Sequence, residues 1–212
     1  MVVHLNTDLS GRSKTKLEFE DFGKNVKEIL NNQTSRFVFP QYPHLTPAAV
    51  ILPILNTDRG IEVLFTRRTN LVRSHRGQVS FPGGAYCATD KDLVETAVRE
   101  TEEEIGVPAS RIEILGKLPA LPTVSTGYLV YPLVAILPYP FRFRRNRREV
   151  EEIFTVPIDF LASEQNWRLD QVETDDGMFT TFFCRYKGYL IWGMTARLLR
   201  KFIMILRKSS LI

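Results

Sequence analysis

The stretch that most constrains this chain covers residues 99–107, where four glutamates fill five consecutive positions ahead of a glycine. At about 100° per residue, a helix would carry Glu100, Glu103 and Glu104 on one stripe beside its apolar face. Carboxylates on one stripe repel each other, and a divalent cation offsets this repulsion because it needs several carboxylate oxygens at once. The stretch therefore predicts a metal site on a helix. A solvated acidic surface is the alternative interpretation of such a charge run.

The limits of this helix can also be predicted. Its apolar face is expected to consist of Val94, Ala97, Val98, Thr101 and Ile105. Asp90 or Asp92 is expected to cap its start, because a side-chain oxygen there can accept from the first free backbone N–H groups. Gly106 followed by Pro108 is a stop signal. Glu102 should project into solvent, away from both the apolar face and the carboxylate stripe.

The pattern of residues 85–107 resembles the Nudix box, the signature of hydrolases that act on nucleoside diphosphates linked to another group. The family form is G-x(5)-E-x(7)-R-E-U-x-E-E-x-G-U, where U is an apolar residue. The second half of the box matches from Arg99 to Val107. The first half departs, because Lys91 stands where the family has its first glutamate and Ala85 where it has its first glycine.

These departures resemble the coenzyme A pyrophosphatase branch of the Nudix family. In that branch the box follows a Phe-Pro-Gly-Gly sequence, which this chain has at residues 81–84. The branch also carries an upstream motif, L-L-T-x-R-(S/A)-x(3)-R-x(3)-G-x(3)-F-P-G-G, and residues 64–84 match it in register. The resemblance implies that Asp90 replaces the missing glutamate by holding Arg99. Two adjacent motifs in the correct register are far more specific than a single glycine-rich loop.

The resemblance also implies which residues form the site. The expected catalytic residues are Glu103, Glu100, Glu104 and Arg99, and the three glutamates are the expected ligands of Mg²⁺ or Mn²⁺. The expected substrate contacts are Arg73, His75, Gln78, Arg67, Phe81, Gly83 and Gly84. Arg67 and Arg68 would point to opposite faces of a strand, so at most one of them faces the ligand. Arg99 is expected to orient the glutamates. Glu103 is the first candidate for the general base and Glu149 the second.

Strands interleaved with helices predict an α/β fold, and the resemblance implies a Nudix-type α/β/α sandwich with a mixed β-sheet. Strands are expected at residues 48–55, 61–67, 111–118, 128–137, 149–156, 178–186 and 189–191, and a final helix at 194–207. Residues 149–157 and 191–197 also resemble the coenzyme A branch. We predict a Nudix hydrolase domain over residues 46–212, preceded by an N-terminal arm and linker over residues 1–45 with a helix at 19–30.

Composition is that of an ordinary globular chain, with 44% hydrophobic and 25% charged residues among 212, which is enough for one core. The first 36 residues lack the apolar run of a signal peptide, and prolines interrupt the most apolar later stretch. Two cysteines do not make a disulfide framework or a metal-thiolate site. We therefore expect a cytoplasmic protein without a transmembrane segment.

Residues 141–148 carry five arginines and two phenylalanines on a chain of net charge +4. Basic residues interleaved with aromatic ones are typical of nucleic-acid binding. The run is short and the net charge modest, which favours a solvated loop first, a contact to an acidic substrate second and nucleic acid third. The apolar residues 202–206 near the end of the last helix are expected to pack against the sheet or a second copy of the chain, which would make a homodimer. Contact with a membrane surface is the further alternative.

The resemblance predicts metal-dependent hydrolysis of the pyrophosphate bond of coenzyme A or its thioesters. The products would be 4′-phosphopantetheine, or its acyl form, and adenosine 3′,5′-bisphosphate. One alternative is a hydrolase of another small nucleoside diphosphate derivative, such as ADP-ribose or NADH, or of capped RNA. The other is a catalytically silent module that binds nucleotides, which the substitutions at Lys91 and Ala85 keep open.

Overall fold

The computed structural model describes residues 9–32, 44–70, 76–123, 126–174 and 177–212. Its helices are α1 (Leu9–Asn32), α2 (Leu93–Ile105), α3 (Ile158–Ala162) and α4 (Gly193–Lys208). Its strands are β1 (Thr46–Thr57), β2 (Gly60–Arg68), β3 (Val79–Ser80), β4 (Gly83–Ala85), β5 (Glu113–Lys117), β6 (Leu121–Pro122), β7 (Tyr128–Ile136), β8 (Val150–Pro157), β9 (Trp167–Thr174), β10 (Gly177–Tyr186) and β11 (Tyr189–Trp192). Short 3₁₀ helices cover Ala109–Arg111 and Glu164–Asn166.

The larger sheet is mixed, as the sequence predicts. Its main path is β3-β2-β1-β7-β5, with β4 beside β1, β6 beside β7 and β8 beside β2. β1 and β7 run parallel, whereas β2 and β8 pair antiparallel to their neighbours. The central strands β1 and β7 are buried along most of their length because other elements cover both faces of the sheet. This explains why their sequences are almost continuously apolar.

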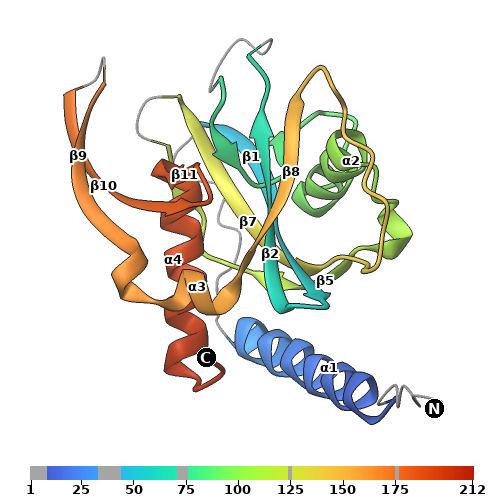
Figure 1. Cartoon of the computed structure of the whole chain (residues 1–212). Helices are drawn as coiled ribbons and strands as arrows, with labels where there is room; N and C mark the ends of the chain where they lie inside the picture. Colours follow the sequence, from blue (N-terminus) through green and yellow to red (C-terminus); the bar gives the residue numbers. More distant parts are fainter. Residues whose placement is uncertain (1–8, 33–43, 71–75, 124–125, 175–176) are drawn as a thin grey trace, which may run out of the picture.

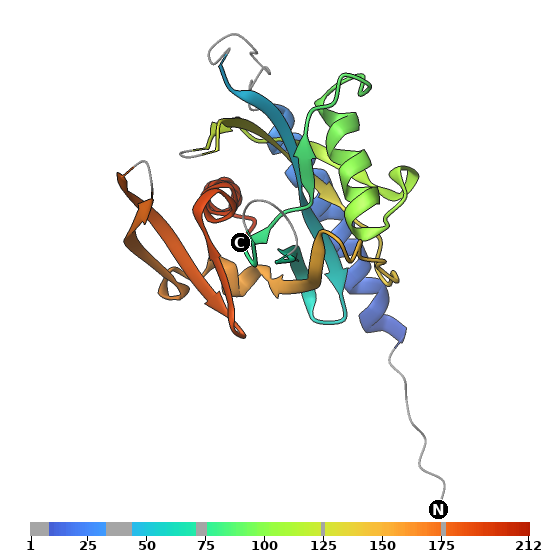
Figure 2. The ribbon, with the colours of Figure 1, turned by 90° about the horizontal axis from the view of Figure 1, so that it is seen from above.

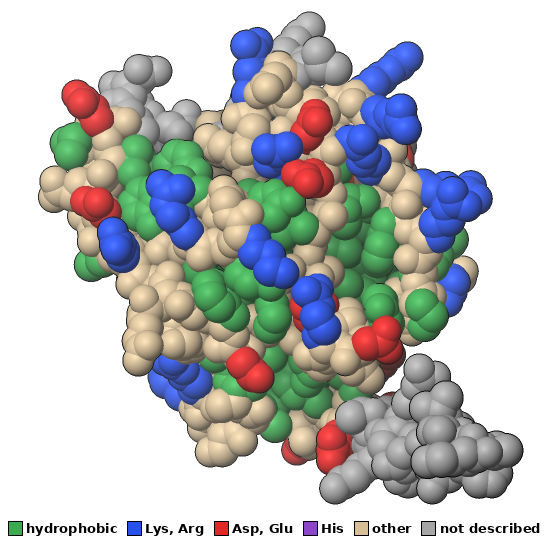
Figure 3. Space-filling model, in the orientation of Figure 1, with side chains coloured by type: hydrophobic (Ala, Val, Ile, Leu, Met, Phe, Trp, Pro, Cys, Tyr) green, Lys and Arg blue, Asp and Glu red, His purple; other side chains and the backbone are tan. Residues whose placement is uncertain are grey.

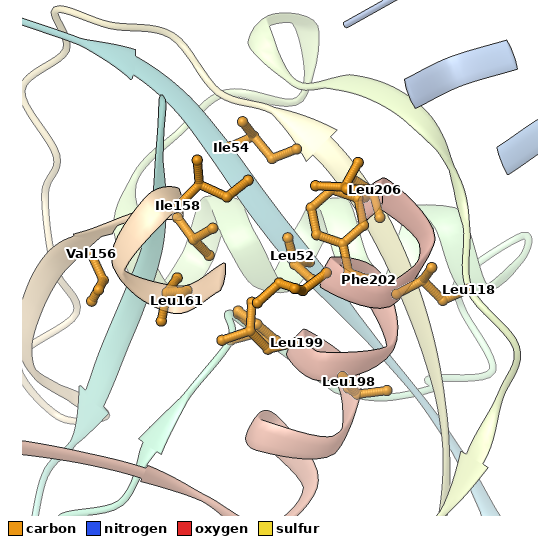
Figure 4. Packing of buried hydrophobic residues seen from close by; sticks show 14 of the residues in the cluster. Leu52, Ile54, Leu118, Val156, Ile158, Leu161, Leu198, Leu199, Phe202 and Leu206 are labelled. Carbon is orange, nitrogen blue, oxygen red and sulfur yellow. The ribbon is translucent and has the colours of Figure 1, made fainter. Parts of the chain in front are cut away.

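The alternation of side chains along β1 divides the interior into two cores. Ala49 and Ile51 belong to a cluster that includes buried residues of α2. Leu52 and Ile54 belong to the other cluster, where Figure 4 shows them beside Phe202 of α4. Helices α2 and α4 therefore cover opposite faces of the sheet, as Figures 1 and 2 show from two directions. The expected three-layer α/β/α sandwich is confirmed.

Helix α1 of the N-terminal arm runs over residues 9–32 and is longer than the helix expected at residues 19–30. The apolar periodicity that predicts it begins only at Phe19, which is why its first turns were not expected. Val26 and Leu30 are buried in the core on the α4 side of the sheet. A Cβ at Gly116 of β5 would lie 2.5 Å from the Cβ of Leu30, so this glycine lets the helix approach the strand closely.

A second, antiparallel sheet of order β11-β10-β9 lies beside α4. The rings of Phe154 in β8 and Tyr189 in β11 stack with 3.7 Å between their centroids, which joins this sheet to the larger one. The buried Trp167 at the start of β9 donates from Nε1 to the carbonyl of Leu161 in α3 at 2.8 Å. The second sheet and α4 lie together on one side of the larger sheet, as Figures 1 and 2 show.

Candidate active site

Helix α2 begins and ends at residues that the sequence indicates. Of the two candidate caps, Asp92 is the one that acts, because its Oδ1 accepts from the backbone N–H groups of Val94 at 2.8 Å and Glu95 at 2.9 Å. At the other end, Gly106 adopts the left-handed conformation with φ of 74° and donates to the carbonyl of Glu102. These local signals place the four glutamates of the helix in a defined rotation.

The predicted rotation of α2 is confirmed. Ala97, Thr101 and Ile105 are buried against the sheet, and Glu102 is exposed. The three glutamates of the stripe differ in exposure. The side chain of Glu104 is 3% exposed, that of Glu100 is 18% exposed and that of Glu103 is 57% exposed. The stripe therefore runs from the core to the solvent, and Glu104 lies at its buried edge.

Arg99 lies between the loop before α2 and the glutamates of the helix. Its Nε and Nη2 donate to the two carboxylate oxygens of Asp90 at 2.9 and 3.0 Å. Its Nη1 donates to Glu100 at 2.8 Å and to Glu103 at 3.4 Å. Hydrogen bonds from Arg99 and from Thr96 hold the pKa of Asp90 well below its usual range. Asp90 thus holds Arg99 by two hydrogen bonds, and Arg99 contacts two of the helix carboxylates.

Glu104 is a buried carboxylate in a cluster of like charges. Burial, together with the nearby charges of Glu149 and Glu100, raises its pKa to about 8. Arg68 opposes this shift from 3.7 Å, and the backbone N–H of Gly83 donates to the carboxylate. Burial also raises the pKa of Glu100. The negative charge at this point exceeds what the neighbouring arginines neutralise.

A cavity of about 500 Å³ opens beside these carboxylates. One side, which we call the carboxylate wall, consists of Glu100, Glu104, Glu149 and Arg68. Another side comes from β10, β11 and the start of α4. This aromatic wall consists of Phe179, Trp192, Gly193, Met194, Thr195, Arg197 and Leu198. The floor includes side chains of β1, β3, β4 and β7. Sequence reasoning missed the aromatic wall as a binding surface, because Trp192 and the apolar side chains after it also suit a core.

Many of the residues expected from the sequence meet at this cavity. Its lining includes Glu100, Glu104, Gln78, Phe81, Gly83, Gly84 and the second general-base candidate Glu149. Glu103 and Arg99 stand beside Glu100 but do not line the cavity. Arg73 and His75, which were expected to contact substrate, lie outside the described residues. Residues of both motifs are thus brought together from the segment between β2 and β4 and from α2.

The structure places Arg68, and not the expected Arg67, at the cavity. Arg67 points to the other face of β2, where its Nη2 lies 3.1 Å from a carboxylate oxygen of Glu152. Arg68 lines the cavity and faces Glu104. The difference follows from the alternation of side chains along a strand, which allows only one of two successive residues to reach a given face.

The two glycines of β4 let the strand pass under the carboxylates. A Cβ at Gly84 would lie 2.5 Å from the carboxylate carbon of Glu100, so any larger residue there would displace that carboxylate. A Cβ at Gly83 would lie 2.3 Å from the backbone oxygen of Ala49 in β1. The neighbouring Phe81 is buried and stacks on Phe65 with 5.2 Å between ring centroids. Phe81 therefore fixes this segment by packing, while it also lines the cavity.

The arginine-rich loop between β7 and β8 brings Glu149 to the site. Phe141 and Phe143 pack against a core cluster at the end of α2. The backbone N–H of Arg144 donates to the backbone carbonyl of Ile105, and that of Asn146 donates to the backbone carbonyl of Glu104. The side chain of Asn146 then donates to Glu149 at 3.2 Å. The five arginines of the loop are exposed, and Figure 3 shows basic side chains along this edge of the molecule. The aromatic side chains of the run are therefore in the core, which agrees with a solvated loop.

The residue types on the carboxylate wall fit a divalent cation. Within the described residues, no three His, Cys, Asp or Glu side chains stand close enough together to hold a metal ion. However, Oε2 of Glu104 is buried and has no hydrogen-bond partner among those residues. A buried carboxylate oxygen without a donor, beside other carboxylates, suits a hard cation.

A protein-family model for the NUDIX domain matches residues 44–176 of the chain, which is more than half of its length. The chain belongs to the Nudix family. It is similar to a protein of Photorhabdus laumondii that is named an uncharacterized Nudix hydrolase NudL, with 39% identity over 154 residues, 73% of this chain and 81% of that protein. The NudL protein of Pectobacterium atrosepticum is 36% identical over 179 residues, 81% of this chain and 92% of its own length.

Solved structures agree with the Nudix fold. A MutT/nudix family protein from Enterococcus faecalis aligns with a TM-score of 0.50 and 13% identity over 90% of this chain and 74% of its own. The chain is therefore a Nudix hydrolase, an enzyme class that generally uses divalent metal ions and acts on small-molecule substrates. None of the helices in the described ranges is both long enough and apolar enough to span a membrane.

Proposed function

We propose that this Nudix hydrolase cleaves the pyrophosphate bond of coenzyme A or its thioesters. Water adds across the P–O–P bridge and leaves 4′-phosphopantetheine, or its acyl form, and adenosine 3′,5′-bisphosphate. The observation that carries this proposal is the upstream motif at residues 64–84, which stands in register with the box at residues 99–107. The cavity supports it, because Arg68, Gln78 and Gly84 from the first motif line the same space as Glu100 and Glu104 from the second.

The proposed metal ligands are Glu100, Glu103 and Glu104, with Mg²⁺ or Mn²⁺ as the cation. When bound, the cation would neutralise phosphate charge and lower the pKa of a water molecule. Arg99 holds the glutamates in position through its bonds to Asp90, Glu100 and Glu103. Arg68 lies at the cavity beside Glu104 and can donate to a phosphate oxygen, since a guanidinium offers several N–H groups in one plane.

The position of Glu149 makes it the favoured general base. Glu149 lines the cavity, and a hydrogen bond of 3.2 Å from Asn146 holds its carboxylate where it can take a proton from water. Glu103, the first candidate from the sequence, is the most exposed glutamate of the stripe and does not line the cavity. We therefore assign Glu103 to the metal and Glu149 to the proton transfer.

The base assignment is tested with Glu149→Gln and Glu103→Gln. Loss of the base should lower kcat by roughly 10²- to 10⁴-fold and leave the metal concentration that gives half-maximal rate unchanged. Glu103→Gln should instead raise that metal concentration. A raised metal requirement for Glu149→Gln, with an unchanged one for Glu103→Gln, would reverse the two roles.

The substrate is tested with a panel of pyrophosphates, with Mg²⁺ and Mn²⁺ in turn and product masses as the readout. The panel contains coenzyme A, an acyl-coenzyme A, dephospho-coenzyme A, ADP-ribose, NADH and capped RNA. Coenzyme A or its thioester should give the highest kcat/KM, and loss of the 3′-phosphate should lower this value roughly 30- to 1,000-fold, because charge-assisted hydrogen bonds to a phosphate are strong. Equal turnover of coenzyme A, dephospho-coenzyme A and ADP-ribose would defeat the proposal. No turnover of any compound would favour a silent binding module.

A further inference from the structure

The aromatic wall of the cavity contains a positively charged side chain that has no role in the reaction described above. Arg197 lies on α4, about one turn after the helix begins, and its side chain is partly exposed where it lines the cavity. It belongs to neither the box nor the upstream motif. Residues 191–197 resemble the coenzyme A branch in sequence, and the proposed chemistry assigns them no role.

Arg197 differs from the other arginines near it in having no carboxylate partner within the described residues. Arg68 faces Glu104 across 3.7 Å. Arg200, one turn further along α4, pairs with Glu164 at 2.8 Å on the outer surface. The next basic residue on the side of Arg197 is Lys201, and burial together with the charge of Arg197 lowers its pKa. Two neighbouring cations without an acid among the described residues leave a positive potential that suits an anionic ligand.

Aromatic surface adjoins this cation. Trp192 and Phe179 line the cavity on the same wall. The Trp192 ring is held by Phe183, since the two rings stack at 6.0 Å with 6° between their planes. A planar base stacks well on rigid aromatic side chains, and an arginine beside them can bind a phosphate on the attached sugar. Aromatic rings beside an arginine that has no carboxylate partner in the described part of the chain therefore suit a nucleotide that carries a phosphate apart from its pyrophosphate.

The two walls offer separate binding groups for the two phosphate-bearing parts of a coenzyme A molecule. The groups that shift the pKa of Glu104 are Arg68, Glu149 and Glu100, all on the carboxylate wall. That wall is the proposed place of the cation and the pyrophosphate. A separate dianionic phosphate cannot share the same carboxylates without repulsion, and it needs its own cation elsewhere in the cavity.

On the basis of the function proposed above, we infer that Arg197 binds the 3′-phosphate of the adenosine 3′,5′-bisphosphate half of the substrate. Trp192 and Phe179 contact the adenine base on the same wall. The α4 wall thus determines specificity for substrates with a 3′-phosphate, whereas the carboxylate wall carries out the hydrolysis common to the family.

The first test compares kcat/KM for coenzyme A and dephospho-coenzyme A in the unmodified enzyme, in Arg197→Gln and in Arg200→Gln. Arg197→Gln should lower kcat/KM for coenzyme A by about 10- to 100-fold through KM, because one charge-assisted contact is lost. It should leave dephospho-coenzyme A within about threefold, since that contact is absent there. Arg200→Gln is the matched control on the same helix and should leave the ratio of the two substrates unchanged.

The second test measures binding without catalysis. Adenosine 3′,5′-bisphosphate and 5′-AMP are titrated into the metal-free protein, with calorimetry and tryptophan fluorescence as readouts. The unmodified protein should bind the bisphosphate at least tenfold more tightly, and Arg197→Gln should bring the two affinities together. Thermal melting of both arginine variants checks that the fold is kept.

The outcomes separate this inference from the function on which it rests. If the enzyme hydrolyses coenzyme A and prefers the 3′-phosphate, but the preference survives Arg197→Gln and disappears in Arg73→Ala, the inference is overturned and the function stands. If coenzyme A is not hydrolysed, the function fails, and a bisphosphate preference lost in Arg197→Gln would still support the phosphate site. Equal binding of both nucleotides to the unmodified protein also overturns the inference.

Discussion

Helices α2 and α4 cover opposite faces of the sheet, and both reach the same cavity with side chains of opposite charge. On α2, the carboxylates of Glu100 and Glu104 are met by Arg99 at 2.8 Å and Arg68 at 3.7 Å. On α4, Arg197 has no carboxylate partner among the described residues. The charges of α2 are therefore organised within the protein, whereas the charge of α4 is available to a ligand.

This contrast between the charges of α2 and α4 explains how one cavity can accept a ligand that carries both a metal ion and several phosphates. A buried carboxylate is costly because it loses its hydration, and the cost falls when a cation arrives. A partly exposed arginine keeps much of its hydration and gains from binding an anion. We expect the metal ion to bind at the carboxylates of α2 and the phosphate of the nucleotide to bind at Arg197 of α4. The following variants test that division.

The largest effect is expected from Glu104→Gln. The substitution removes a proposed metal ligand without touching the core face of α2. It should lower kcat at saturating Mg²⁺ by roughly 10²- to 10³-fold, which corresponds to about 3–4 kcal/mol of transition-state stabilisation. Steady-state kinetics with the best substrate of the panel measure this, and Mg²⁺ should no longer raise the melting temperature of the variant. Turnover close to that of the unmodified enzyme would remove Glu104 from the metal site.

The same variant should be more stable than the unmodified protein when no metal is present and the pH is near 8. Burial raises the pKa of Glu104 from 4.5 to about 8. Below pH 4.5 both the folded and the unfolded chain hold the proton, so the shift has no effect. Between pH 4.5 and 8 the unfolded chain releases the proton and the folded chain retains it, so stability falls as the pH rises through this window.

In free energy of unfolding, the penalty near pH 8 is on the order of 3–5 kcal/mol, and Glu104→Gln avoids it. Thermal unfolding in a chelator at pH 5 and at pH 8 measures the gain, with the pH 5 pair as the control. A variant that is less stable than the unmodified protein at both pH values would show that Glu104 is held mainly by Arg68 and not strained by burial.

A smaller effect separates the two glycines of β4. Gly84→Ala would push against the end of the flexible Glu100 side chain, whereas Gly83→Ala would push against the backbone of β1. Gly84→Ala should therefore keep the fold and lower kcat by roughly 10- to 100-fold, because it displaces a carboxylate by about an ångström. Gly83→Ala should lower the melting temperature and the yield of folded protein. The opposite pattern would mean that β4 supports the fold at Gly84 and the site at Gly83.

The smallest effect is expected from Glu102→Gln on the solvent side of α2. Its carboxylate is exposed, and it accepts a long hydrogen bond of 3.4 Å from the backbone N–H of Ala109. Stability should change by less than about 0.5 kcal/mol, and kcat should remain within about twofold. Kinetics and thermal melting beside Glu104→Gln measure both. A loss as large as that of Glu104→Gln would contradict the division of α2 into a metal side and a solvent side.

Features that depend on neighbours along the chain could be predicted before the structure was known. The start of α2 at Asp92, its end at Gly106 and the buried position of Thr101 follow from capping and from a period of 3.6 residues. The pairing of Asp90 with Arg99 was expected from the match to the coenzyme A branch, and both residues lie within ten positions of each other. The mixed sheet and the three layers were expected on the same grounds.

The set of side chains that line the cavity depends on tertiary packing and could not be predicted from the sequence. Arg68 is chosen over Arg67 because one face of β2 meets α2, and the local pattern of the strand does not tell its two faces apart. The aromatic wall reaches β3 through a hydrogen bond from Thr195 to the carbonyl of Val79, 116 positions away. Strand β9 was not expected, because residues 168–171 are exposed and its sequence does not keep a period-two apolar pattern. Contacts between distant residues depend on packing, and no local periodicity contains that information.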